Sequence, residues 1–298
     1  RGAAGRVRLS GRYGMIGRHI RGGLSSRAAA LTALPLALLI CAAFIWPLVR
    51  FMSASVLDPV PTLEHYEKLF TTELYLRVLF GTVVTAFTVT LATLALGYPI
   101  AVLMARLRGP AAWIVTACVL IPLWTPVLVR TYAWIIILQR RGIMNSTLMS
   151  VGLIEQPLTM LYTFGAVILA MTHVLMPFMI LPIQSSLRTI PKELPQAAIG
   201  LGASRLRVFT NVTWPLSLPG VMAGCLMVFI ISLGFYITPA LLGGPSTLMI
   251  STLISQQAFE LLNWPFASAI SVGLLVLTLG IATVFRRVLK IERLSLHA

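Results

Sequence analysis

The chain has 298 residues, of which 58% are hydrophobic and only 10% are charged, and its mean hydropathy is +0.91. Because soluble domains carry charge on about 25% of their residues, this composition excludes an ordinary soluble protein and predicts an integral membrane protein. The net charge of +15 is compatible with nucleic-acid binding, but 17 of the 23 Lys and Arg residues lie in four short segments beside apolar spans. Membrane topology and anionic lipid explain that distribution better, so no nucleic-acid partner is expected.

The first 28 residues contain seven arginines and no acid. Such a segment cannot form a core, so we expect a cytoplasmic tail over 1–28 and a transmembrane domain over 29–298. An organelle transit peptide is an alternative for the tail, because such peptides are also rich in arginine and poor in acids. Residues 29–49 are uncharged, and their length of about 31 Å exceeds the apolar region of a cleaved signal peptide. We interpret them as a retained first helix.

Five further apolar segments complete a set of six predicted transmembrane helices. After a polar external loop over 50–78, they are expected over residues 79–105, 111–129, 161–187, 215–242 and 265–288. Pro122 and Pro126 interrupt the third helix, which predicts a kink inside a bundle, where neighbours satisfy the freed carbonyl groups. Residues 130–160 are amphipathic and broken by Gly and Pro, so we place them outside, partly on the membrane surface.

The distribution of basic residues predicts the orientation. With the amino terminus inside, the cytoplasmic segments carry 17 Lys and Arg residues and the external segments carry 6. The positive-inside rule then places both termini and the segment that follows the fourth helix on the cytoplasmic face.

The longest charged interruption in the second half of the chain, over 190–221, predicts two short helices. Pro191 and Pro195 suit a first helical turn, and Gly202 followed by Ser204 indicates a helix stop and a new N-cap. In the first helix, one narrow apolar face contains Leu194, Ala197, Ala198 and Leu201. The two alanines at its centre would let another surface approach closely.

This stretch resembles the EAA motif of the inner-membrane permeases of binding-protein-dependent ABC importers, through QAAIGLGA at 196–203 and WP at 214–215. The resemblance implies a coupling loop over 188–214 whose helix docks on an ATPase subunit; a solvated loop with no partner is the alternative. Gln196 stands where the family has glutamate, so it keeps hydrogen-bonding capacity and loses the charge. The residues implied in ATPase coupling are Glu193, Gln196, Ala197, Ala198, Gly202, Ser204, Arg205 and Pro215.

The sequence lacks the motifs of a self-sufficient transporter or a membrane enzyme. None of its three lysines follows a phosphate-binding Gly-rich loop, and no Asp or Glu lies inside a predicted span. The HExxH and GxSxG motifs are also missing, and the three cysteines have no paired spacing, so no catalytic residue, metal site or cofactor is expected in this chain. His173 is a lone intramembrane histidine that we expect to be satisfied by an interhelical hydrogen bond.

Two clusters stand at the outer ends of the third and fifth predicted helices. They contain Pro122, Trp124, Pro126, Arg130, Tyr132 and Trp134, and Phe235, Tyr236, Pro239, Gly243, Gly244 and Pro245. The first is either part of a translocation path or an interfacial aromatic belt, and the second is either a gate or a plain turn. Both resemble the WT..LVRTYAW and TP.LLGGP runs of the spermidine/putrescine branch of the permeases. On the path we expect Trp124, Arg130, Tyr132, Trp134, Tyr236 and Pro239.

The sequence thus predicts an all-α integral membrane protein with six transmembrane helices and a cytoplasmic coupling helix, the type I ABC importer permease fold. The resemblance implies a bacterial inner membrane, a second permease subunit, a periplasmic substrate-binding protein and an ABC ATPase dimer that binds ATP and Mg. It also implies a polyamine substrate; opine-like compounds, phosphonates and metal chelates are alternatives. A secondary carrier needs intramembrane acids that are missing, and a membrane scaffold does not explain the coupling motif.

Overall fold

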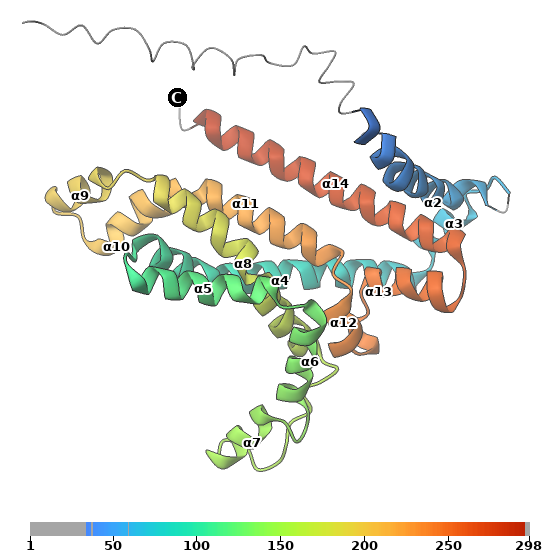
Figure 1. Cartoon of the computed structure of the whole chain (residues 1–298), viewed down its shortest axis with the longest axis horizontal. Coiled ribbons are helices and arrows are strands. Elements are labelled where there is room, and N and C mark those ends of the chain that lie inside the picture. The colour runs from blue at the N-terminus through green and yellow to red at the C-terminus, as the bar shows by residue number, and fades with distance from the viewer. Residues whose placement is uncertain (1–33, 37, 59, 296–298) are drawn as a thin grey trace, which may run out of the picture. The chain divides into compact units, whose positions relative to one another are not determined.

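The computed structural model describes residues 34–36, 38–58 and 60–295, and every regular element in this part of the chain is a helix (Figure 1). The chain divides into two compact units, Arg1–Phe51 and Met52–Ala298. The expected boundary between the tail and the domain, at 28/29, lies outside the described residues. The first apolar helix runs over Leu34–Leu57 and includes a π turn at Cys41–Ile45, followed by α2 at Trp46–Leu57. It therefore ends eight residues later than predicted, because a single arginine does not break an otherwise apolar run.

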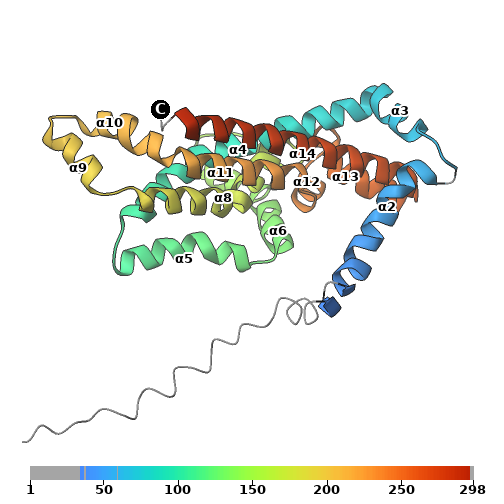
Figure 2. The ribbon, with the colours of Figure 1, turned by 90° about the horizontal axis from the view of Figure 1, so that it is seen from above.

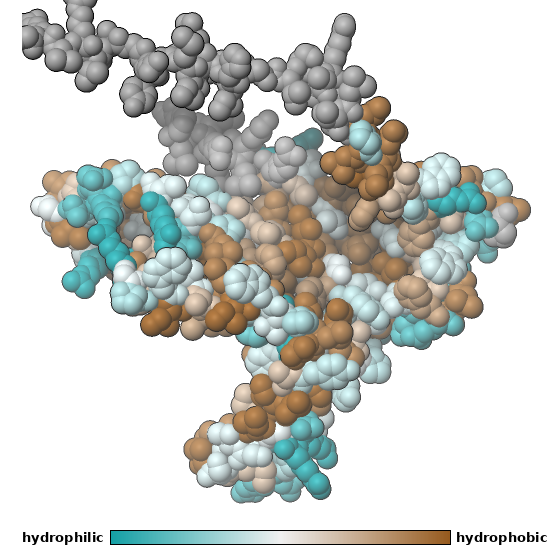
Figure 3. All heavy atoms as spheres, in the orientation of Figure 1, coloured by the Kyte–Doolittle hydropathy of each residue, from teal (hydrophilic) through white to brown (hydrophobic). Residues whose placement is uncertain are grey.

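The second unit contains the remaining helices, which are α3 Glu64–Thr71, α4 Glu73–Arg106, α5 Pro110–Trp124, α6 Val127–Leu138, α7 Ile143–Ser150, α8 Phe164–Thr189, α9 Glu193–Gly200, α10 Arg205–Val208, α11 Trp214–Leu233, α12 Ile237–Leu242, α13 Ile250–Ser255 and α14 Trp264–Ser295. Single π turns lie at Phe209–Thr213 and Gln256–Glu260, and a short 3₁₀ turn lies at Pro245–Thr247. The long helices α4, α8, α11 and α14 run alongside one another in both ribbon views (Figures 1 and 2). On the face that Figure 3 shows, hydrophobic side chains cover the middle of these helices and hydrophilic ones gather at the α9 end.

Helices α4, α8 and α11 pack together and form the main core of the second unit. Small residues allow their close contact: a Cβ added at Gly220 would lie 2.5 Å from the Cβ of Ser186, and one at Gly224 would lie 2.8 Å from the sulfur of Met179. Glycines four residues apart present one flat helix face, which is a common way for membrane helices to approach. Tyr98 and Ser217 share a hydrogen bond of 3.0 Å that links α4 to α11 inside this core.

The third predicted span is broken rather than kinked. Helix α5 and the segment after it are bent by 102° at the residues between Trp124 and Val127. Thr125 and Pro126 both have extended backbone, because a proline disfavours the helical conformation of the residue before it. The prediction that this helix lies in the bundle interior is wrong for this chain, since α5 contains no buried residue. Five described helices can cross a membrane, and the bent pair would make a sixth.

The fifth span begins earlier and ends earlier than predicted. An apolar helix extends over Arg205–Leu233, so the expected second short helix of the coupling loop is the first turn of this span. Pro215, predicted as the first residue of this span, therefore lies inside a longer helix. A π turn at Phe209–Thr213 lies directly before it, where the N–H that proline lacks leaves a carbonyl group of the preceding turn without its helical donor. After Leu233 the chain breaks before the separate short helix α12, where the sequence predicted one continuous span to 242.

Candidate coupling surface and translocation path

The turn between α9 and α10 has the local structure that its sequence predicts. Gly202 has a φ of +86°, in the left-handed region that favours glycine, and its N–H donates to the carbonyl of Ile199 at 2.9 Å. The N–H of Ala203 donates to the carbonyl of Ala198 at 3.0 Å, which closes the end of α9. The Ser204 hydroxyl accepts a hydrogen bond from the N–H of Arg207 at 3.3 Å and caps α10. The predicted stop at Gly202 and the N-cap at Ser204 are confirmed.

Helix α9 has two distinct faces. One face lines a pocket and consists of residues spaced three or four positions apart, which are Lys192, Pro195, Gln196 and Ile199. On the other side, Leu201 is 90% exposed and Leu194 is 46% exposed, and Ala197 is exposed between them. Leu194, Ala197 and Leu201 of the predicted apolar face are thus open to solvent or to a partner, and Ala198 is half-buried. Gln196 belongs to the pocket side.

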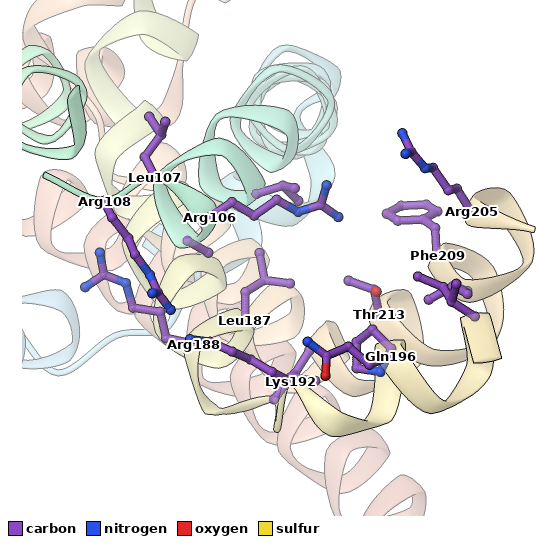
Figure 4. Close-up of a pocket in the computed structure, with 16 residues that line it drawn as sticks. Arg106, Leu107, Arg108, Leu187, Arg188, Lys192, Gln196, Arg205, Phe209 and Thr213 are labelled. Carbon is purple, nitrogen blue, oxygen red and sulfur yellow. The ribbon is translucent and has the colours of Figure 1, made fainter.

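The pocket has a volume of about 830 Å³ and lies between the ends of α4 and α8, helix α9 and the α10 segment (Figure 4). Five cationic residues line it, Arg106, Arg108, Arg188, Lys192 and Arg205, and none of its lining residues is acidic. We missed this pocket in the sequence, because we interpreted four of these charges only as topology signals and Arg205 as a coupling residue.

Two residues of α6 form hydrogen bonds to other helices: Trp134 bonds to α8, and Thr131 bonds to α12. The indole Nε1 of Trp134 donates to Nδ1 of His173 on α8 at 3.3 Å, and the two rings meet edge to face at 5.7 Å. The interhelical hydrogen bond expected for His173 is confirmed. Thr131 shares a hydrogen bond of 3.1 Å with Thr238 on α12, so the chain segments of both clusters lie side by side. Neither threonine carries a sequence signal that identifies its partner.

The side chains of the predicted path residues nevertheless point to different surroundings. Trp124 is 87% exposed and Tyr132 is 54% exposed. Tyr236 is 43% exposed and its hydroxyl accepts from the Ser255 hydroxyl at 3.1 Å. Pro239 is buried in α12. These four side chains thus differ in their surroundings, since three are exposed and one is buried.

Arg130 differs from its neighbours in the first cluster. Its Nε and Nη1 atoms are buried and have no hydrogen-bond partner among the described residues. Because buried donors without an acceptor are unfavourable, these two nitrogens of the partly buried side chain are suited to an acceptor group that is not in the described part of the chain.

Two comparisons identify the family. The sequence profile of the family described as "Binding-protein-dependent transport system inner membrane component" matches residues 97–290, which is more than half of the chain. The chain belongs to this family. It is 36% identical over 223 residues to the spermidine/putrescine transport system permease protein PotB of Escherichia coli (strain K12), covering 75% of this chain and 81% of that protein. It is 27% identical over 266 residues to PhnU of Salmonella typhimurium, a permease named for 2-aminoethylphosphonate transport, covering 88% of this chain and 93% of that protein.

Solved structures show the same fold. A bacterial alginate ABC transporter in complex with its oligosaccharide-bound periplasmic protein matches with a TM-score of 0.71 and 18% identity, covering 87% of this chain and 93% of that chain. The MetNI methionine ABC transporter matches with a TM-score of 0.58 and 21% identity, covering 74% of this chain and 96% of that chain. The protein therefore has the type I ABC importer permease fold. It is an inner-membrane permease subunit and not an enzyme, and ATP is hydrolysed by a separate subunit of the importer.

Proposed function

We propose that this permease imports a polyamine of the spermidine/putrescine type from the periplasm to the cytoplasm. The observation that carries the proposal is the 36% identity to the E. coli spermidine/putrescine permease, because it extends over 81% of that protein. We also propose that this chain assembles with a second permease subunit, an ATPase dimer that binds ATP and Mg, and a periplasmic binding protein. The positive-inside rule supports a topology with the tail over 1–28, the carboxyl terminus and α9 in the cytoplasm.

Uptake into proteoliposomes tests the proposed substrate. The purified complex, with its own binding protein in the medium and ATP inside, is expected to accumulate labelled spermidine, and excess putrescine is expected to compete. A matched preparation without ATP is the control. Failure of spermidine to enter, together with ATP-dependent entry of labelled 2-aminoethylphosphonate, would contradict the proposal.

A phosphonate-type solute is the second candidate function, because one specific feature of the structure favours it. The guanidinium of Arg130, whose Nε and Nη1 have no acceptor among the described residues, is suited to an anionic group, and a polyamine has none. The relative named for 2-aminoethylphosphonate transport has lower identity, 27%, so we rank this function below polyamine import.

The exposed face of α9 is proposed to dock on the ATPase. A leucine that is 90% exposed at a helix end, next to small exposed residues, is an apolar contact without a partner in the described chain. In a docked complex Leu201 would be buried, which stabilises association by about 1.5 to 3 kcal/mol. Ser204 and Gly202 would act indirectly, by holding the helix end in place.

Leu201→Asn is expected to weaken association with the ATPase by about ten- to a hundredfold, because an amide replaces the buried apolar contact. Leu206→Asn is the matched control, since Leu206 is also exposed, at 73%, but lies on α10 outside the predicted face. Titration of the purified ATPase against the permease pair in nanodiscs measures both affinities. Equal affinities for the two variants would contradict docking through this face.

A further inference from the structure

We propose that the basic pocket beside α9 binds the phosphate headgroup of an anionic phospholipid from the cytoplasmic leaflet. The proposal rests on the orientation given above, which places α9 in the cytoplasm. The chemistry required of the ligand is one or more phosphate oxygens joined to an apolar chain. Three properties of the pocket support it: the number of unpaired cations, their positions on the helices, and the apolar part of the lining.

The cations come from separate elements and meet without any acid. Arg106 ends α4, Arg188 lies in the last turn of α8, and Lys192 precedes α9. None of the five cationic lining residues forms an ion pair with a described residue, and the hydrogen bond from Arg188 to the carbonyl of Met104, at 3.4 Å, leaves its charge uncompensated. Like charges that share one hollow repel one another, and a bound anion relieves that repulsion.

Helix dipoles do not account for the cluster. Cations are favoured at helix carboxyl ends, which suits Arg106 and Arg188. Lys192, however, is the N-cap of α9, and Arg205 is the first residue of α10, where the dipole disfavours a positive charge. Two cations in unfavourable positions, both facing the same pocket, indicate an anion that they hold in common.

Gln196 leaves the pocket without an internal counterion. Figure 4 shows the Gln196 amide beside Lys192, among the residues that line the pocket. A carboxylate at this position would neutralise part of the cluster, whereas the amide adds donors and no charge. The negative charge must therefore come from outside the pocket.

The apolar lining favours a lipid over free phosphate. Apolar side chains line the same pocket as the cations, among them Val102, Leu187, Ile199 and Phe209. The pocket also lies where the apolar spans Glu73–Arg106 and Phe164–Thr189 end, which is the level at which lipid headgroups meet membrane helices. A headgroup on the cations with an acyl chain along the apolar wall satisfies both kinds of lining residue.

The test compares the original transporter complex with variants of it, each purified in full from phosphatidylcholine vesicles doped with phosphatidylglycerol. The quantity compared is the amount of lipid that each complex retains. Native mass spectrometry counts the phosphatidylglycerol that remains bound. Arg106→Gln with Arg188→Gln is expected to lower the retained phosphatidylglycerol at least about tenfold, because cations near the membrane surface attract anionic headgroups. Arg140→Gln with Arg141→Gln is the matched control, since both residues are exposed, outside the pocket, and change the net charge equally.

Gln196→Glu supplies a variant that removes no cation and keeps the side-chain shape. It is expected to lower retention as well, by placing a carboxylate among the cations. Equal retention by the original, the double arginine variant and Gln196→Glu would overturn the proposal. Displacement of the lipid from the complex by millimolar inorganic phosphate would show a free-phosphate site instead. Retention of the lipid by the purified permease pair but not by the complex with the ATPase would show a site for an acidic protein segment. Either result also overturns the proposal.

Retention is measured without substrate or ATP, so its outcome is independent of the transport test. Normal spermidine uptake without arginine-dependent retention would reject the lipid site alone. Normal retention without spermidine uptake would reject the polyamine proposal alone.

Discussion

Replacing Gly202 with proline is expected to abolish the stimulation of ATP hydrolysis by the loaded binding protein, while the permease stays in the membrane with its partner subunit. The φ of Gly202 is +86°, and a proline ring fixes φ near −65°, so the variant cannot form the turn that ends α9. Proline also removes the N–H that donates to Ile199 at 2.9 Å. The expected local loss is about 3 kcal/mol or more, enough to displace α9 from its position after α8.

Ala198→Trp is expected to have the same effect through a different physical cause. Ala198 lies between Leu194 and Leu201 on the predicted docking face, and its own turn would remain intact in this variant. An indole at a close-packed contact holds the two surfaces apart, with an overpacking penalty of about 1 to 3 kcal/mol. Two variants that fail for unrelated reasons separate a docking defect from a folding defect.

Gly200→Ala is the control for both variants. It is also on α9, but a Cβ there meets nothing within 4 Å, and its φ is not in the left-handed region. ATP hydrolysis by the assembled complex in nanodiscs is measured with and without the loaded binding protein, and subunit levels are measured in the same samples. Full stimulation of either variant at normal subunit levels would refute the coupling role of this helix.

The features that could be predicted from the sequence are those with local causes. The turn at Gly202 and the cap at Ser204 depend on hydrogen bonds between residues no more than five positions apart, so their signals are complete in the sequence. The apolar spans depend on composition over about 20 residues, which also determines whether a helix can cross the membrane. The sequence predicted that His173 needs a hydrogen-bond partner. It could not show that this partner is Trp134, because that depends on how α6 packs against α8.

Other features depend on contacts between distant segments. Pro122 and Pro126 indicate lost backbone hydrogen bonds, but the 102° bend also depends on where α6 packs, including the Thr131 contact with Thr238 on α12. Charged residues before Pro215 were interpreted as a loop, although arginines at a helix end extend their charged groups to the polar boundary and continue the helix. The basic pocket joins Arg106 to Arg188 across 82 positions of sequence, so no local pattern could indicate it.

Arg130→Gln is expected to raise the thermal stability of the permease and to leave spermidine uptake undiminished. The Nε and Nη1 atoms of Arg130 are buried without a hydrogen-bond partner in the described chain. Arg130 is only partly buried, so solvent screens part of its charge, and removing it with its two unpaired donors is expected to stabilise the subunit by about 1 kcal/mol. Arg77→Gln is the control: Arg77 is exposed and pairs with Glu73 on the same helix, so little change is expected.

The effect on transport follows from the charge of the solute. A guanidinium about 6 Å from a passing ammonium group opposes it by about 3 kcal/mol at an effective dielectric constant near 20, so its loss cannot slow a polyamine that passes there. For a phosphonate the sign reverses, and the same variant is expected to lose uptake by up to about a hundredfold. Uptake of labelled solute is measured in proteoliposomes with the original complex and with the Arg130→Gln complex, and the melting temperature of each complex is measured as well. Together these values distinguish a polyamine from a phosphonate substrate. Lower stability of the assembled pair would mean that the partner permease supplies a carboxylate to Arg130, and a strong loss of uptake at unchanged stability would replace the polyamine with an anionic solute.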